Sequence, residues 1–300
     1  MKILVTGGSG RMGSKIVRKL IEKKNNVSYT YFNNKLDVGI GYKLDISKKD
    51  ESINLISKLK PDIVIHTASI TNIDLCEINK KLADSVNIYG TENVILGCQK
   101  THSKIIYIST SFVFNGESKE YFEEDEASPS TYYGLTKFKG EEIVKNSKLP
   151  FLILRTDQPY DWKEKWQRTN SVLRVIHTLQ EGNVLNEIMD WYNVPTYLPN
   201  LVNALERLIE KNLLGVYHVC GSSFVNRCEW ALVTAKIFGL NKNMIKPVNS
   251  DILNLPAKRV NVNLCNQKLF KKTGIKMMGI EKGLKLMKEN GFEKNYLIKS

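Results

Sequence analysis

The chain begins Met1-Lys2-Ile3-Leu4-Val5-Thr6-Gly7-Gly8-Ser9-Gly10-Arg11-Met12-Gly13, and this stretch decides the fold. Its apolar run at 3–5 predicts a short buried strand, and the amphipathic pattern over 11–24 predicts a helix. Between the two lie glycines spaced G-x-x-G-x-x-G, namely Gly7, Gly10 and Gly13. Glycines at such a turn let the backbone pass close to a pyrophosphate, and the start of the helix offers N–H groups to it. We therefore expect a dinucleotide-binding start.

Apolar runs alternate with helical patterns as far as residue 155. Strands are predicted at 27–32, 62–66, 104–108 and 150–154, and helices at 82–100 and 131–146. Strands that alternate with helices imply a parallel sheet with right-handed crossovers. Nearly continuous apolar runs are typical of strands that are covered on both faces. The predicted fold class is α/β, a Rossmann-type doubly wound parallel sheet with a smaller C-terminal substrate-binding lobe.

The regular pattern loosens after Arg155. We expect a dinucleotide-binding domain over residues 1–155, with a return strand near 215–221, and a mainly substrate-binding lobe over 156–300. The segment 157–168 is expected to be a loop. Its two tryptophans, Trp162 and Trp166, are predicted to pack within that loop, and a cover over a ligand is the alternative.

Composition is that of an ordinary globular protein, with 42% hydrophobic and 25% charged residues. No apolar run approaches the roughly 18 to 20 residues that span a bilayer, and the N-terminus does not resemble a signal peptide. We expect a cytoplasmic protein with no membrane partner. The five cysteines are odd in number and show no C-x-x-C spacing, so neither disulfides nor a metal site is expected.

The net charge of +13 comes from lysines spread along the whole chain. Such spacing is typical of solvated helix faces, although a basic field would also attract a diphosphate ligand. No recognition motif accompanies the charge, so no nucleic-acid partner is expected.

The expected second strand ends in Tyr31-Phe32-Asn33-Asn34-Lys35, without the acidic residue that holds the ribose 2′-OH in NAD-preferring proteins. A neutral end, with Asn33 there, tolerates a 2′-phosphate. The expected cofactor is NADP(H), and NAD(H) stays open. Asp45 could accept a hydrogen bond from the adenine amine, or it could cap a helix over 47–59.

Tyr133 and Lys137 lie four residues apart, on one face of the predicted helix over 131–146. An ammonium beside a phenol lowers the phenol pKa, and a tyrosine tuned in this way can give a proton to a ketone. Thr110 follows the strand at 104–108, where hydroxyls point into the ligand crevice of a doubly wound sheet. Thr110 could therefore bond the same substrate oxygen.

Several stretches together resemble an extended short-chain dehydrogenase/reductase. They are Thr6 to Gly13, Pro61 to Ala68, Val86 to Thr91, Ser109 to Gly116 and Tyr133 to Lys137. More narrowly, the chain is similar to the dTDP-4-dehydrorhamnose reductase group. Its Ile108-Ser109-Thr110-Ser111-Phe112-Val113-Phe114-Asn115-Gly116 is similar to that group's I-S-T-D-Y-V-F-D-G.

The resemblance implies three sets of site residues. The catalytic set is Thr110, Tyr133 and Lys137. The cofactor-binding set is Gly7, Gly10, Arg11, Met12, Gly13, Asn33, Asp45, Ile46, Ala68, Ser69, Tyr133 and Lys137. The substrate-binding set is Ser111, Phe112, Gln158, Asn170 and Arg259, and no metal is implied. For Arg259, an ordinary surface ion pair is the alternative to contact with the sugar or its phosphates.

The chain departs from the group's pattern where the sugar should lie. Ser111 stands in place of an aspartate, and Phe112 in place of a tyrosine. The run Arg155-Thr156-Asp157-Gln158-Pro159-Tyr160 replaces an R-T-S-W-V-Y-like run, so a tryptophan becomes Gln158. The substrate could therefore differ from dTDP-4-dehydrorhamnose in its sugar or its nucleotide.

The expected function is NADP(H)-dependent reduction of a nucleotide-linked 4-keto-6-deoxy sugar, with Tyr133 as proton donor. One alternative is a nucleotide-sugar epimerase or dehydratase with tightly bound NAD. The other is a non-catalytic regulatory subunit of the same fold, like that of methionine adenosyltransferase. A homodimer is left open.

Overall fold

The computed structural model describes residues 1–292 of the chain. The last eight residues of the predicted substrate lobe, 293–300, lie outside the described residues. The main sheet consists of β1 (Lys2–Thr6), β2 (Asn26–Tyr31), β3 (Ile40–Lys43), β4 (Ile63–His66), β5 (Lys104–Thr110), β6 (Phe151–Thr156) and β11 (Gly215–His218).

These seven strands lie in the order β11-β6-β5-β4-β1-β2-β3, and all neighbours are parallel. The direction of winding reverses between β1 and β4, which is the switch point where doubly wound sheets open a ligand crevice. The predicted Rossmann-type α/β fold is confirmed. β11 returns from the small lobe to the sheet edge beside β6.

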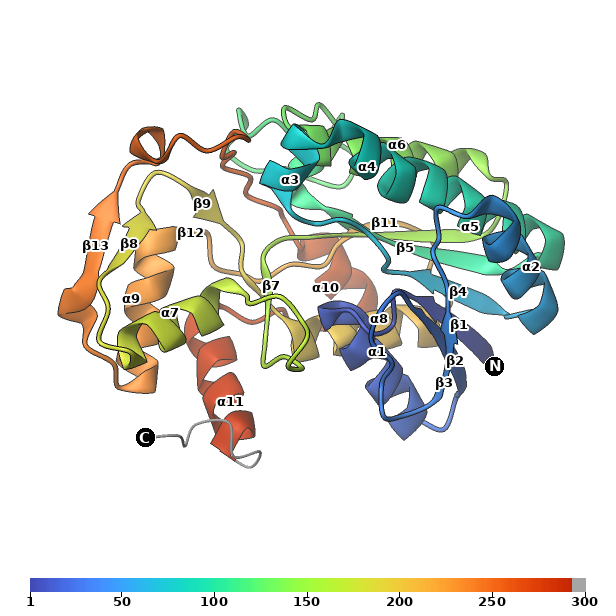
Figure 1. Cartoon of the computed structure of the whole chain (residues 1–300), viewed down its shortest axis with the longest axis horizontal. Coiled ribbons are helices and arrows are strands. Elements are labelled where there is room, and N and C mark those ends of the chain that lie inside the picture. The colour runs from blue at the N-terminus through green and yellow to red at the C-terminus, as the bar shows by residue number, and fades with distance from the viewer. Residues whose placement is uncertain (293–300) are drawn as a thin grey trace.

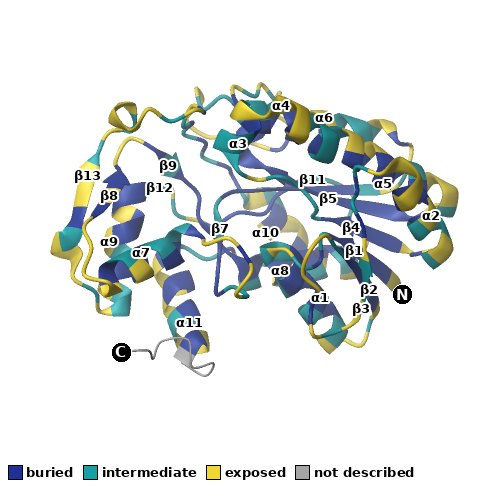
Figure 2. Ribbon diagram, viewed as in Figure 1, coloured by how far each residue is buried: buried dark blue, intermediate teal, exposed yellow. Residues whose placement is uncertain are grey.

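Helices cover both faces of the sheet (Figure 1). One face carries α1 (Arg11–Glu22), α8 (Leu198–Glu210) and α10 (Gln267–Thr273), and the other carries α2 (Lys49–Leu59), α5 (Gly90–Thr101) and α6 (Tyr132–Asn146). Side chains of a strand alternate between faces. Ile3 and Val5 of β1 accordingly pack with α1 and α8, and Leu4 packs with α2 and α5. Figure 2 shows these strands buried under the two helical layers.

The small lobe lies beyond the carboxyl ends of the strands, at the left of Figure 1. Its helices are α7 (Ser171–Gln180), α9 (Arg227–Phe238) and α11 (Ile280–Phe292). Short strand pairs accompany them: β7 (Pro159–Tyr160) with β10 (Thr196–Tyr197), β8 (Leu185–Ile188) with β13 (Ile245–Val248), and β9 (Tyr192–Asn193) with β12 (Val225–Asn226). Asn226 and Glu229 form a capping box that fixes the start of α9.

The helix expected over 82–100 is interrupted. The short helix α4 (Lys80–Ala83) leads into a π-helical turn, Asp84–Tyr89, and α5 follows. A π-helical turn often marks a functional site, because it re-aims the side chains that it carries. Asn87 lies in this turn and is buried. Among residues 1–292, no helix combines the length and the apolar character needed to cross a membrane.

Candidate active site

A cavity of about 620 Å³ lies at the carboxyl ends of the main-sheet strands. The loops that follow β1, β2, β4, β5 and β6 form its walls on one side, and residues of the small lobe close the other. The cavity thus occupies the crevice where sheets of this topology bind ligands. The predicted residues that line it are Gly10, Arg11, Met12, Gly13, Asn33, Ser69, Thr110, Phe112, Tyr133, Lys137, Gln158 and Arg259.

Close packing dictates the glycine turn after β1. A Cβ on Gly13 would come within 2.4 Å of the Gly7 carbonyl oxygen. Gly7 has a positive φ of 67°, and a Cβ there would come within 2.7 Å of the Ala68 backbone. Ala68 therefore supports the turn from β4 and does not line the cavity itself. Only glycine allows the turn to stay this flat beneath a ligand.

Asp45 does not cap the helix that follows it, which was one of its two expected roles. Its carboxylate accepts hydrogen bonds from the backbone N–H of Ser47, at 3.0 Å, and from the Ser47 hydroxyl, at 2.7 Å. Helix α2 begins only at Lys49 and has no side-chain cap, so Asp45 closes a turn before the helix. Asp45 and the buried Ile46 are not among the described residues that line the cavity.

The predicted catalytic residues come together. Thr110 is the last residue of β5, and Tyr133 and Lys137 lie in the first turns of α6, which Thr131 caps through a hydrogen bond from the Gly134 N–H. All three side chains are buried and line the cavity. The Thr110 side chain lies near enough to the Tyr133 phenol to lower its pKa, against the effect of burial. A substrate oxygen placed between these hydroxyls would meet two hydrogen-bond donors.

The expectation that Lys137 lowers the pKa of Tyr133 is wrong in this structure. Burial raises the pKa of the Tyr133 phenol well above its usual value, and the nearby Thr110 side chain offsets only part of that effect. The Lys137 ammonium instead lies over the ring of Tyr107, 4.1 Å from its centroid. Burial lowers the pKa of Lys137 to about 7, against the attraction of Glu141. Tyr133 therefore keeps its proton at neutral pH.

Two buried polar groups hold this arrangement in place. The Asn87 amide donates to the Ile70 carbonyl and to the Thr136 hydroxyl, both at 3.0 Å, and so ties the π-helical turn to α6. Glu141 accepts two hydrogen bonds from Arg155, at 2.8 and 2.9 Å. Arg155 is almost fully buried, so it stabilises the junction of α6 with β6.

The two departures at Ser111 and Asp157 form a single contact. The Ser111 hydroxyl donates to the Asp157 carboxylate at 2.9 Å, and the Val194 N–H donates to the other carboxylate oxygen at 2.8 Å. The group's pattern has the aspartate at position 111 and a serine at 157, so the chain has exchanged the two side chains. Burial raises the pKa of Asp157, against these hydrogen bonds and the charge of Arg227.

An aromatic wall leads from Tyr133 to the small lobe. The ring of Phe112 packs edge-on against Tyr133, 5.8 Å between centroids, and against Trp191, 6.5 Å between centroids. Two arginines lie over Trp191: Arg227 at 5.3 Å and Arg259 at 5.2 Å from the ring centroid. All of these residues line the cavity. Two guanidinium groups therefore lie at the small-lobe end of this aromatic wall.

Both arginines are held by other side chains. Arg259 forms a two-point ion pair with Asp74, at 2.7 and 2.9 Å, and it also lines the cavity. Arg227 donates to the side chain of Gln158 at 3.3 Å. Burial lowers the pKa of Arg227 to about 10. Sequence reasoning missed Trp191 and Arg227, because neither belongs to a local motif.

Asn170 and the two loop tryptophans take different positions from one another. Asn170 caps α7 by accepting from the Leu173 N–H at 3.1 Å and donates to the Asp161 carbonyl at 2.6 Å, and it is not among the described residues that line the cavity. Trp162 is buried and donates to the Met287 carbonyl at 2.6 Å, as expected of a packed loop. Trp166 is 41% exposed and lines the cavity.

A glycine turn at a doubly wound sheet, together with a buried Thr-Tyr-Lys set at the switch-point crevice, defines an extended short-chain dehydrogenase/reductase. The RmlD substrate binding domain model matches residues 1–291, and the chain belongs to that family. Its family and fold place it among NAD(P)-dependent oxidoreductases of the short-chain type.

Individual relatives share about a quarter of its residues. The dTDP-4-dehydrorhamnose reductase of Aggregatibacter actinomycetemcomitans is 28% identical over 238 residues, 77% of each chain. The mouse methionine adenosyltransferase 2 subunit beta is 25% identical over 262 residues, 82% of this chain and 75% of that one. The crystal structure of dTDP-4-dehydrorhamnose reductase from Bacillus anthracis in complex with NADP is 25% identical, with a TM-score of 0.86 over 96% of this chain and 99% of that one.

Proposed function

We propose that the chain is an NADP(H)-dependent reductase of a nucleotide-linked 4-keto-6-deoxy sugar. The observation that carries the proposal is the convergence of Thr110, Tyr133 and Lys137 on one cavity that begins at the glycine turn. The reductase relatives and the NADP complex of the Bacillus anthracis enzyme support it.

Tyr133 supplies the proton in this proposal. When bound, the dinucleotide would supply the hydride that goes to the keto carbon. Tyr133, whose phenol is protonated at neutral pH, gives its proton to the keto oxygen as that oxygen becomes an alcohol. Thr110 holds the same oxygen by a second hydrogen bond and stabilises the charge that develops there. Lys137 is the basic group at the same site, four residues along α6.

The end of β2 favours NADP(H). Phe32, Asn33 and Asn34 line the cavity there and carry no charge. The next carboxylate along the chain, Asp37, is paired with Arg18. A 2′-phosphate would therefore meet amide groups and no unpaired carboxylate at this end.

The small-lobe end of the cavity suits the diphosphate and the sugar of the substrate. Arg227 and Arg259 present guanidinium groups whose fork geometry matches phosphate oxygens. In this proposal they take the diphosphate of the nucleotide sugar, and Phe112 and Gln158 face the sugar. Gln158 has a positive φ of 39° and is held by Arg227, so the sugar meets an amide where the family pattern has an indole.

The test is direct turnover of dTDP-4-dehydrorhamnose with NADPH, followed by the loss of NADPH absorbance. We expect one NADPH consumed for each sugar reduced. Turnover of a nucleotide sugar without net NADPH consumption would favour an epimerase or dehydratase. Absence of turnover with any 4-keto-6-deoxy sugar nucleotide, together with stable co-purification with a methionine adenosyltransferase, would favour the regulatory subunit to which the chain is also related.

A further inference from the structure

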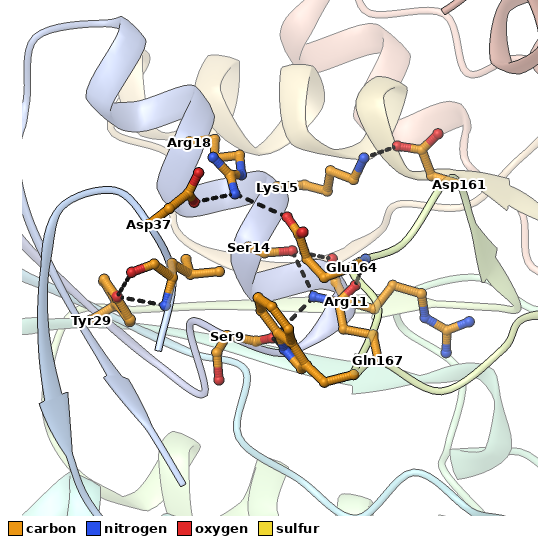
Figure 3. A network of polar contacts seen from close by, with 12 residues as sticks. Ser9, Arg11, Ser14, Lys15, Arg18, Tyr29, Asp37, Asp161, Glu164 and Gln167 are labelled. Atoms are coloured by element: carbon orange, nitrogen blue, oxygen red, sulfur yellow. Dashed lines mark hydrogen bonds and ion pairs between the residues drawn. The ribbon is translucent and has the colours of Figure 1, made fainter. Parts of the chain in front are cut away.

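The segment Asp161–Thr169, here called the strap, connects β7 to α7 and lies along the first helix of the nucleotide-binding half. Asp161 pairs with Lys15 of α1 at 2.6 Å, and Glu164 pairs with Arg18 of α1 at 2.9 Å. Figure 3 shows these two contacts side by side above the glycine turn. Although the strap was assigned to the substrate lobe from sequence, it is fixed to the cofactor-binding half.

The strap also touches the glycine turn itself. Gln167 donates to the Ser9 carbonyl at 3.0 Å and to the Ser14 hydroxyl at 3.1 Å (Figure 3). The Trp166 indole N–H donates to the same carbonyl at 3.3 Å. Trp166, Gln167 and Arg168 all line the cavity. The strap is therefore a wall of the site beside the turn that approaches a pyrophosphate.

Among the described residues, two arginines at this wall, Arg11 and Arg168, lack the carboxylate partner that the other arginines have. The chain contains eight arginines, all within residues 1–292, and six of them reach a carboxylate within ion-pair distance. In this described part of the chain, Arg11 and Arg168 show neither an ion pair nor a side-chain hydrogen bond, and both line the cavity. Burial, with the nearby charge of Arg168, lowers the pKa of Arg11. Arg11 is half-buried and Arg168 is exposed, so an anion bound in the cavity that both line would meet two guanidinium groups that pair with no carboxylate of residues 1–292.

We propose that Arg11 and Arg168 together bind the pyrophosphate of the dinucleotide, so that the strap supplies part of the cofactor site. This inference rests on the proposed function and deepens it. Arg11 directly follows Gly10, in the turn whose N–H groups meet a pyrophosphate. The 2′-phosphate belongs at the end of β2, beside Asn33. The pyrophosphate is common to NADPH and NADH, so the two arginines should serve both cofactors equally.

The experiment measures the binding of NADPH, NADH and dTDP by calorimetry to the full chain and to Arg168→Gln. The matched control is Lys165→Gln, which removes the same charge from an exposed strap residue that is not among those lining the cavity. We expect Arg168→Gln to weaken NADPH and NADH alike, by about tenfold or more, as the loss of a charge-assisted hydrogen bond implies. Binding of dTDP should stay unchanged, as should both dinucleotides in the control.

Each other result overturns the assignment in a distinguishable way. A loss confined to NADPH would place the guanidinium at the 2′-phosphate. A loss confined to dTDP would assign Arg168 to the nucleotide-sugar diphosphate. Unchanged binding of all three would remove Arg168 from the site, with the proposed function intact. A wild-type chain that bound neither dinucleotide would overturn the proposed function and this inference together.

Discussion

The two ends of the cavity are built in different ways. At the end that the proposed function gives to the cofactor, here called the cofactor end, the run 7–13 shapes the site with its backbone. Tight spacing there leaves room for hydrogen alone at three positions, Gly7, Gly8 and Gly13. At the end that the proposed function gives to the substrate, here called the substrate end, side chains from distant segments meet: Phe112, Asp157, Trp191 and Arg259. Recognition by backbone leaves a regular spacing in the sequence, whereas recognition by assembled side chains leaves none.

The largest effect is expected where the two ends meet. Tyr133→Phe removes the proton donor, and turnover should fall by about 10²- to 10⁴-fold, the usual contribution of a general acid. Affinity for NADPH should be unchanged, because the variant keeps the aromatic ring and loses only the hydroxyl. Steady-state rates and calorimetric titration of NADPH measure the two quantities.

The neighbouring tyrosine is the control for that variant. The Tyr132 hydroxyl bonds to Asp84 at 2.8 Å and is not among the described groups that line the cavity. Tyr132→Phe should therefore leave turnover as it is. Equal losses in the two variants, or normal turnover in Tyr133→Phe, would remove Tyr133 from the proposed chemistry.

A smaller effect is expected at the substrate end: exchanging Ser111 and Asp157 should change the stability of the fold and leave the cofactor end unaffected. Ser111→Asp would place a second carboxylate within hydrogen-bond reach of buried Asp157, and like charges repel there. Asp157→Ser would leave the Val194 N–H without its acceptor. The double variant restores one carboxylate and one hydroxyl, so the two changes should be non-additive, with a coupling of roughly 0.5–3 kcal/mol.

Denaturant unfolding of the wild type, both single variants and the double variant measures this coupling. Affinity for NADPH should be unchanged in the double variant, because the contact belongs to the substrate end. Additive losses in stability would show that the Ser111–Asp157 contact does not replace the family's arrangement.

A further effect, on stability and not on turnover, concerns Lys137 and its dependence on pH. The pKa of this lysine is lowered to about 7 in the folded chain, against about 10.4 in an unfolded one. Between these values the unfolded chain binds a proton that the folded chain does not, so stability rises as pH increases from about 7 to about 10. Lys137→Met removes the titrating group, and with it the cost of releasing this proton on folding. The variant should melt at a higher temperature than the wild type at pH 7, and the difference should shrink towards pH 10.

Thermal unfolding without added dinucleotide checks this trend at pH 7, 8 and 9. Lys139→Met, an exposed lysine on the same helix, is the control and should show no such change with pH. A Lys137→Met variant that melted below the wild type at every pH would show that the folded chain stabilises the ammonium instead.

Much of the fold and part of the site follow from the sequence. The glycine spacing and the Tyr133–Lys137 interval are local patterns, and local patterns survive folding because the helix and strand periods are fixed. The sign of the Tyr133 pKa shift could not be predicted, since it depends on how deeply the phenol is buried by other elements. Arg227 was missed for a related reason: it reaches the cavity through the packing of α9, far along the chain from the catalytic residues.

The return strand β11 governs how the chain can be divided. It supplies the outer neighbour of β6, and α8 and α10 cover one face of the same sheet although they follow the small lobe's first segments in sequence. A fragment that ended at residue 155 would expose a full row of unpaired N–H and C=O groups along β6, with bare apolar side chains beside it. Such an open edge recruits strands from other molecules. Expression of the nucleotide-binding half alone should therefore yield aggregates, and a soluble minimal version must keep the later segments that complete the sheet.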